Sequence, residues 1–91
     1  MDDLPKLWES IKVDLRRARN LLPNSSEDQH SLSRYYEFIE HNELELACDE
    51  LEGSAKDRAV SGEFWLALRD AAKKMQLYEH AARFEKRAEM P

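Results

Sequence analysis

The chain has 91 residues, 42% of them hydrophobic and 36% charged, and its 19 acidic and 14 basic side chains give a net charge of −5. This length suits one domain, so we expect a single domain over residues 1–91. Two glycines and three prolines supply too few turn residues for a sandwich or barrel, and the apolar content is too high for a disordered chain. The negative charge makes nucleic acid an unfavourable partner and favours a basic one.

The single cysteine, Cys48, cannot form an internal disulfide, so the fold needs no oxidising compartment. The acidic start, Met1-Asp2-Asp3, differs from the basic start of a secretory signal. No uninterrupted apolar run approaches the ~18 residues of a membrane span. We therefore expect a cytoplasmic protein with no membrane partner.

The first predicted helix runs from Leu4 to about Leu21 and ends there because Pro23 restricts the residue before it. Apolar residues recur along it at intervals of three and four, which is typical of an amphipathic helix with one core-facing stripe. That stripe comprises Leu4, Leu7, Trp8, Ile11, Leu15, Ala18 and Leu22.

A second helix is predicted over roughly residues 26–40 and a third over about 43–55, with a break at His41-Asn42. The spacing of Asn42 and Glu45 predicts a capping box at the start of the third helix. The expected apolar face of the second helix comprises Leu32, Tyr35, Tyr36 and Ile39, and that of the third comprises Leu44, Ala47, Cys48 and Leu51.

Residues 54–60 are expected to form a loop, after which Ser61 is a candidate cap for a fourth helix. The pattern falters at Gln76-Leu77, and whether a fifth helix is separate is left open, since no glycine or proline marks the join. The apolar residues assigned to this part are Phe64, Trp65, Leu68, Ala71, Ala72, Met75, Tyr78, Ala81, Ala82 and Phe84. The sequence thus predicts an all-α fold, a compact bundle of four or five short amphipathic helices.

No arrangement typical of catalysis or cofactor binding is present in the sequence. His30, His41 and His80 fall in different helical segments and form no motif with Cys48, whose place on an apolar stripe indicates a buried thiol. There is no HxxxH or CxxC pair for a metal, and two isolated glycines cannot form a phosphate-binding loop. We expect no enzyme activity, no metal and no cofactor.

The segment between Tyr35 and Ala55 contains seven acidic residues and no Lys or Arg, so it carries −7 while the rest of the chain sums to +2. Such concentrated like charge costs stability unless a partner offsets it, although a solvated helix face is the ordinary alternative. Leu46 should project away from the core, which would make it an apolar anchor within a charged rim. The predicted partner-binding residues are Glu37, Glu40, Glu43, Leu46, Asp49 and Glu50.

The run from Tyr36 to Leu51 resembles the helix–turn–helix region of small bacterial immunity proteins of the MafI type. Phe64-Trp65 through Met75-Gln76-Leu77 is similar to a second element of that family, so the resemblance spans residues 32–78. Asn42 and Gln76 stand where the family pattern has glycine. The resemblance implies a non-catalytic protein that binds and neutralises a toxin encoded nearby, commonly a nuclease with a basic cleft.

Two other functions remain open at this point. A homodimeric adaptor would use Val13, Leu46 and Leu66, which all lie off their helices' apolar stripes. The carboxy-terminal basic residues Lys73, Lys74, Arg83, Lys86 and Arg87 could contact nucleic acid, but they suit helix ends and the acidic hairpin better.

Overall fold

The computed structural model describes residues 4–22, 29–56 and 59–89, and within these residues it contains five α-helices and no strand. The all-α prediction is confirmed, and the fourth and fifth helices are separate. The helices are α1 (Leu4–Asn20), α2 (Gln29–Glu40), α3 (Leu44–Ala55), α4 (Gly62–Lys74) and α5 (Tyr78–Glu89). The predicted start of the second helix near residue 26 lies outside the described residues.

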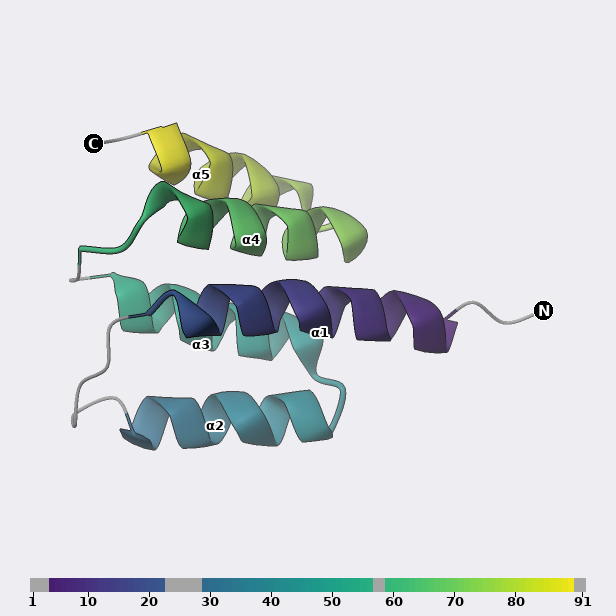
Figure 1. Cartoon of the computed structure of the whole chain (residues 1–91). Helices are drawn as coiled ribbons and strands as arrows, with labels where there is room; N and C mark the ends of the chain where they lie inside the picture. Colours follow the sequence, from purple (N-terminus) through teal and green to yellow (C-terminus); the bar gives the residue numbers. More distant parts are fainter. Residues whose placement is uncertain (1–3, 23–28, 57–58, 90–91) are drawn as a thin grey trace.

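The helices form two hairpins joined through α1 (Figure 1). The α2–α3 hairpin and the α4–α5 hairpin each contribute one helix to the centre, and α1 packs against both α4 and α3. Each hairpin has a three-residue connection, and these two connections lie at the same end of the molecule as the start of α1. The first turns of α1 extend beyond the neighbouring helices at that end (Figure 1).

Both hairpin connections use a non-glycine residue in the left-handed backbone region. Asn42 has φ 57° and Gln76 has φ 61°, and in each case the following N–H reaches back to a carbonyl five residues earlier. Glu43 N donates to Phe38 O at 2.8 Å, and Leu77 N donates to Ala72 O at 2.9 Å. This is the Schellman arrangement, in which a left-handed residue ends a helix and satisfies its last carbonyls.

The predicted capping box of Asn42 with Glu45 is wrong. Glu43, not Asn42, precedes the first residue of α3, and its side chain forms no capping hydrogen bond. Asn42 serves instead as the left-handed end of α2, which takes it out of position for capping the next helix. The Ser61 cap is confirmed, because its Oγ accepts from Phe64 N at 3.4 Å.

The core lies between the two hairpins and α1. Its largest fully buried side chains come from α1, α3, α4 and α5, namely Leu15, Cys48, Leu51, Phe64, Leu68 and Phe84, with Ile11 close behind at 2% exposure. The apolar stripe of α1 was predicted to face this core throughout, but Leu4, Leu7 and Trp8 are 37–49% exposed. The reason is that the start of α1 projects past the helices that bury the rest of the stripe. Tyr36, also predicted on an apolar face, is exposed.

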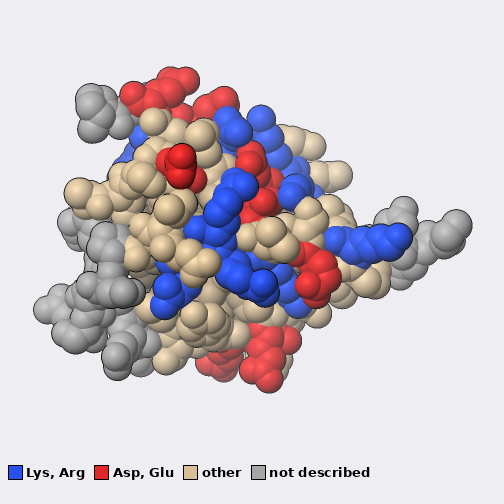
Figure 2. Space-filling view, in the orientation of Figure 1, with Lys and Arg blue, Asp and Glu red and all other residues tan. Residues whose placement is uncertain are grey.

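Charged contacts join α1 to α4. Lys74 Nζ lies 2.7 Å from Oδ2 of the buried Asp14 and donates to Ser10 Oγ at 2.7 Å. The contact between Lys74 and Asp14 is an ion pair without hydrogen-bond geometry, so Asp14 Oδ2 accepts no hydrogen bond within the described residues. Nearby, Arg17 Nη2 donates to Asp70 Oδ2 at 3.0 Å. Figure 2 shows Lys and Arg side chains gathered across the middle of the face that α1 crosses, so positive charge is concentrated there although the chain is acidic.

Candidate protein-binding site

The six residues predicted to bind a partner lie on the α2–α3 hairpin, but they fall into two groups. Glu37, Glu40 and Glu43 are exposed, and no ion pair links them to any basic side chain in the described part of the chain. All three come from the end of α2 or the connection that follows it. Negative charge at this turn is therefore open to an external partner.

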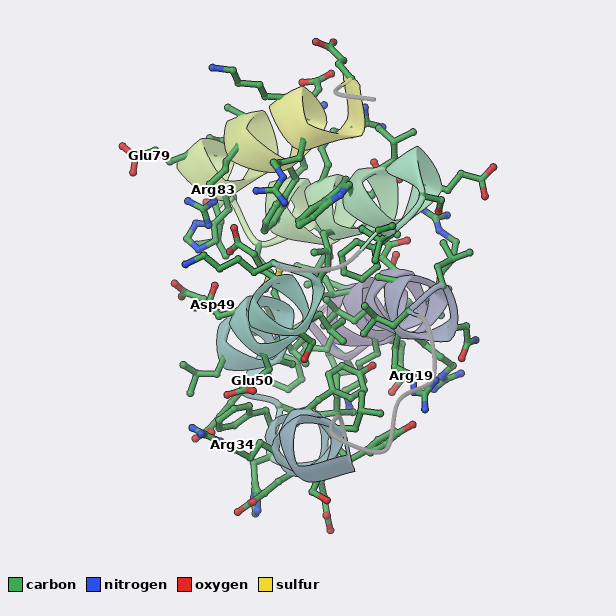
Figure 3. All side chains as sticks on the ribbon, turned by 90° about the vertical axis from the view of Figure 1, so that its left-hand side faces the viewer. Arg19, Arg34, Asp49, Glu50, Glu79 and Arg83 are labelled. Carbon is green, nitrogen blue, oxygen red and sulfur yellow. The ribbon has the colours of Figure 1, made fainter. Side chains whose placement is uncertain are left out.

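The other predicted carboxylates have partners within the chain. Glu50 Oε1 lies 3.4 Å from Arg34 Nε on α2, and Asp49 Oδ1 lies 3.2 Å from His80 Nε2 on α5. In Figure 3 Arg34 lies beside Glu50 and Arg83 lies close to Asp49, so α2 and α5 place basic groups on both sides of α3. The expectation of a fully uncompensated acidic segment is thus wrong for its second half.

The strongest of these pairs involves Glu52, which was counted in the acidic segment. Arg83 Nε and Nη2 donate to its two carboxylate oxygens at 2.8 and 2.9 Å. This two-point hydrogen bond raises the pKa of the Arg83 guanidinium above its ordinary value. The expectation that the carboxy-terminal basic residues complement the acidic hairpin is confirmed for Arg83.

One group of ligand-type side chains was missed by the sequence argument. One carboxylate oxygen each from Glu45 and Asp49 and one ring nitrogen of His80 lie within 4.8 Å of one another. Carboxylate and imidazole ligands suit Zn²⁺, so these three residues could hold such an ion. The two carboxylates are four residues apart on α3, but His80 comes from α5, which packs on α4, and its side chain reaches across to Asp49.

Cys48 is fully buried, as the sequence predicted. Burial, reinforced by the neighbouring Asp49 and Glu52 carboxylates, raises the pKa of its thiol well above the ordinary value. A thiol in this state forms little thiolate near neutral pH and is unsuited to act as a nucleophile or metal ligand.

Leu46 is 46% exposed, which confirms the prediction that it points away from the core. It borders a groove of about 540 Å³ at the end of the molecule where both hairpin connections meet the start of α1. The groove is lined by Leu7, Trp8, Ile11, Leu44, Leu46 and Met75, together with Asn42, Glu43, Glu45, Lys74 and Gln76. Apolar side chains from α1, α3 and the α4–α5 connection thus meet the unpaired Glu43.

Sequence reasoning did not find this groove because it assigned Leu7 and Trp8 to the core. The pattern showed that both residues belong to the same stripe as Ile11, but it could not show that the start of α1 extends beyond the neighbouring helices. Glu43 and Leu46 are the two predicted site residues that line the groove. The remaining four lie on the hairpin outside it.

In the described part of the chain, no helix has both the length and the apolar character needed to cross a bilayer. Comparison of the chain with family models, curated proteins and solved structures returned no match. The similarity to MafI-type immunity proteins therefore stays a resemblance in sequence pattern, and the function below is argued from the molecule's own surface.

Proposed function

We propose that this chain is a non-catalytic immunity-type protein that binds and neutralises a cationic protein toxin. The observation that carries the proposal is the acidic end of the α2–α3 hairpin, where Glu37, Glu40 and Glu43 have no basic partner among the described residues. The exposed Leu46 lines the same groove as Glu43. An apolar anchor next to unpaired charge is the usual composition of a protein interface.

The distribution of charge supports a partner at this end of the molecule. In the acidic segment, Glu50 and Glu52 are offset by arginines and Asp49 has a hydrogen-bonding partner in His80, so the negative charge without any partner in the described chain lies toward the turn. Four of the five basic residues of α1 lie from Lys12 onward, with Lys6 the exception, while the hairpin turn lies beside the first half of this helix. A cationic protein would therefore be drawn to the turn and repelled from the opposite half of α1.

The proposal is tested with the purified product of the adjacent reading frame as the probe. Glu40→Lys with Glu43→Lys changes the net charge from −5 to −1, since each substitution adds two charges. Glu63→Lys with Glu89→Lys makes the same change at the opposite end of the molecule, where α4 begins and α5 ends. This second pair is the matched control.

We expect fast association that slows as salt rises, with the turn variant at least tenfold slower than the control variant at about 50 mM salt. Equal rates for the two variants would show that only net charge matters and would remove the basis of the proposal. Co-expression adds a functional readout, because the chain should relieve the toxicity of that product and the turn variant should relieve it less.

The homodimeric adaptor remains the second candidate, because Val13 and Leu46 are 56% and 46% exposed. Leu66, the third residue assigned to it, is only partly exposed. Sedimentation equilibrium separates the two functions: an adaptor would show a concentration-dependent dimer, whereas the inhibitor should remain a monomer in the absence of its partner.

A further inference from the structure

The groove at the two hairpin connections is an unpartnered part of the molecule's main apolar stripe. On α1, Ile11 and Leu15 are 2% and 0% exposed, whereas Leu7 and Trp8, one turn earlier, are 37% and 38% exposed. The stripe therefore leaves the core within a single turn and continues into the groove, where Leu46 of α3 faces it. Exposed apolar patches rimmed by polar residues mark protein-binding sites, and Trp is enriched among the side chains that anchor a partner.

The charged residues that line the groove indicate which kind of partner it can bind. Glu43 and Glu45 line it and form no ion pair within the described residues. The one lining cation, Lys74, is already held by Asp14 at 2.7 Å. The groove thus offers negative charge around an apolar floor. A second copy related by a two-fold axis through the groove would bring these carboxylates close to their own equivalents, whereas a basic partner would offset them.

The two hairpin connections add polar side chains to the groove. Asn42 and Gln76, the two non-glycine residues with positive φ in the described chain, both line the groove. Glycine would occupy either position with less strain, but it would remove a side-chain amide from the groove.

We infer that the groove binds an amphipathic helix of the cationic partner, with an apolar side chain packed on Trp8 and Leu46 and flanking Lys or Arg side chains beside Glu43 and Glu45. The inference rests on the proposed function and specifies which segment of the partner is recognised. Helices commonly bind apolar grooves in this way, through anchors spaced three and four residues apart.

The groove is tested first with synthetic peptides. The main probe is a fluorescein-labelled 18-residue helix that has a Leu stripe and Lys at its other positions. One control replaces Lys by Glu, and a second replaces Leu by Ser. Fluorescence anisotropy with the full chain should show the Leu/Lys helix binding at least tenfold more tightly than either control. Equal binding of the Ser/Lys helix would overturn the inference, because charge alone would explain it.

Variants of the chain locate the binding. Trp8→Ala should weaken the Leu/Lys helix at least tenfold, and Val13→Ala, which removes a more exposed apolar side chain of the same helix outside the groove, should change it less than twofold. Leu46→Ser, on α3, is a second groove variant in case Trp8→Ala unfolds the chain, which circular dichroism would reveal. Similar effects of groove and control variants, or a dimer of the chain that Trp8→Ala abolishes, would overturn the inference.

The same variants with the adjacent gene product separate this inference from the proposed function. If Glu40→Lys with Glu43→Lys and Leu46→Ser weaken that complex but Trp8→Ala does not, the proposed function stands and the groove inference fails. If the unmodified chain does not bind the product at all, the proposed function fails and the peptide result alone decides whether the groove binds a basic helix.

Discussion

Replacing Gln76 by glycine should stabilise the protein, because this residue ends α4 at φ 61°. A left-handed conformation costs a non-glycine residue roughly 1–2 kcal/mol. Glycine offsets part of that gain, since its freer unfolded chain loses about 0.4–1 kcal/mol more on folding. The net gain in the free energy of unfolding should be about 0.5–1 kcal/mol, which raises Tm by about 2–6 °C in a chain of this size.

The assay is urea denaturation at 25 °C, followed by circular dichroism, with the midpoint compared at unchanged slope. Gln76→Ala is the matched control: it keeps a Cβ, and therefore the strain, so it should not share the gain. Asn42→Gly should gain less than Gln76→Gly, because asparagine tolerates φ 57° better than glutamine does. A loss of stability in Gln76→Gly, or an equal gain in Gln76→Ala, would show that the left-handed backbone at position 76 does not destabilise the protein.

Three further predictions concern buried or paired groups. Lys74→Met should lower the free energy of unfolding by about 2–3 kcal/mol, because it leaves the Asp14 carboxylate buried and unpaired. In a double-mutant cycle measured by urea denaturation, adding Asp14→Leu should restore most of this loss. Cys48 should react with Ellman's reagent at pH 8 only at the rate of unfolding, since its buried thiol has a raised pKa; rapid labelling of the native chain would contradict this. Partial burial of the Asp70 carboxyl opposes its ionisation, but hydrogen bonds from Arg69 and Arg17 outweigh this effect and hold its pKa below the usual value. The ionised Asp70 therefore contributes stability above about pH 4, and this contribution is lost as the pH falls through the folded pKa. Asp70→Asn should accordingly show a shallower loss of stability in acid than the unmodified chain, and an unchanged slope would count against these hydrogen bonds.

Apolar spacing was sufficient to predict the first three helices, the helical character of the rest of the chain and most of the core, although it left open whether the last two helices are separate. It succeeds because each helix buries one face and the residues on that face recur every three or four positions. The break at Gln76-Leu77 was visible in the same pattern even without glycine or proline. The exposure of Leu7 and Trp8 was not predictable, because it depends on where the neighbouring helices end in space.

The candidate site was predicted in part for a similar reason. Counting charges found the acidic hairpin, and helical spacing showed that Leu46 points outward. Both properties depend only on residues that are close in the sequence. It could not find that Arg34 and Arg83 neutralise Glu50 and Glu52, since those contacts depend on how α2 and α5 pack against α3. The same packing creates the groove, whose lining comes from three helices and two turns.

The most direct test of the account is to map the binding surface in the complex with the adjacent gene product by backbone amide NMR. The account predicts that the largest shift changes fall on the first half of α1 and on residues 42–46, with little change where α4 begins and α5 ends. Changes concentrated at that opposite end, or along the basic half of α1, would contradict it.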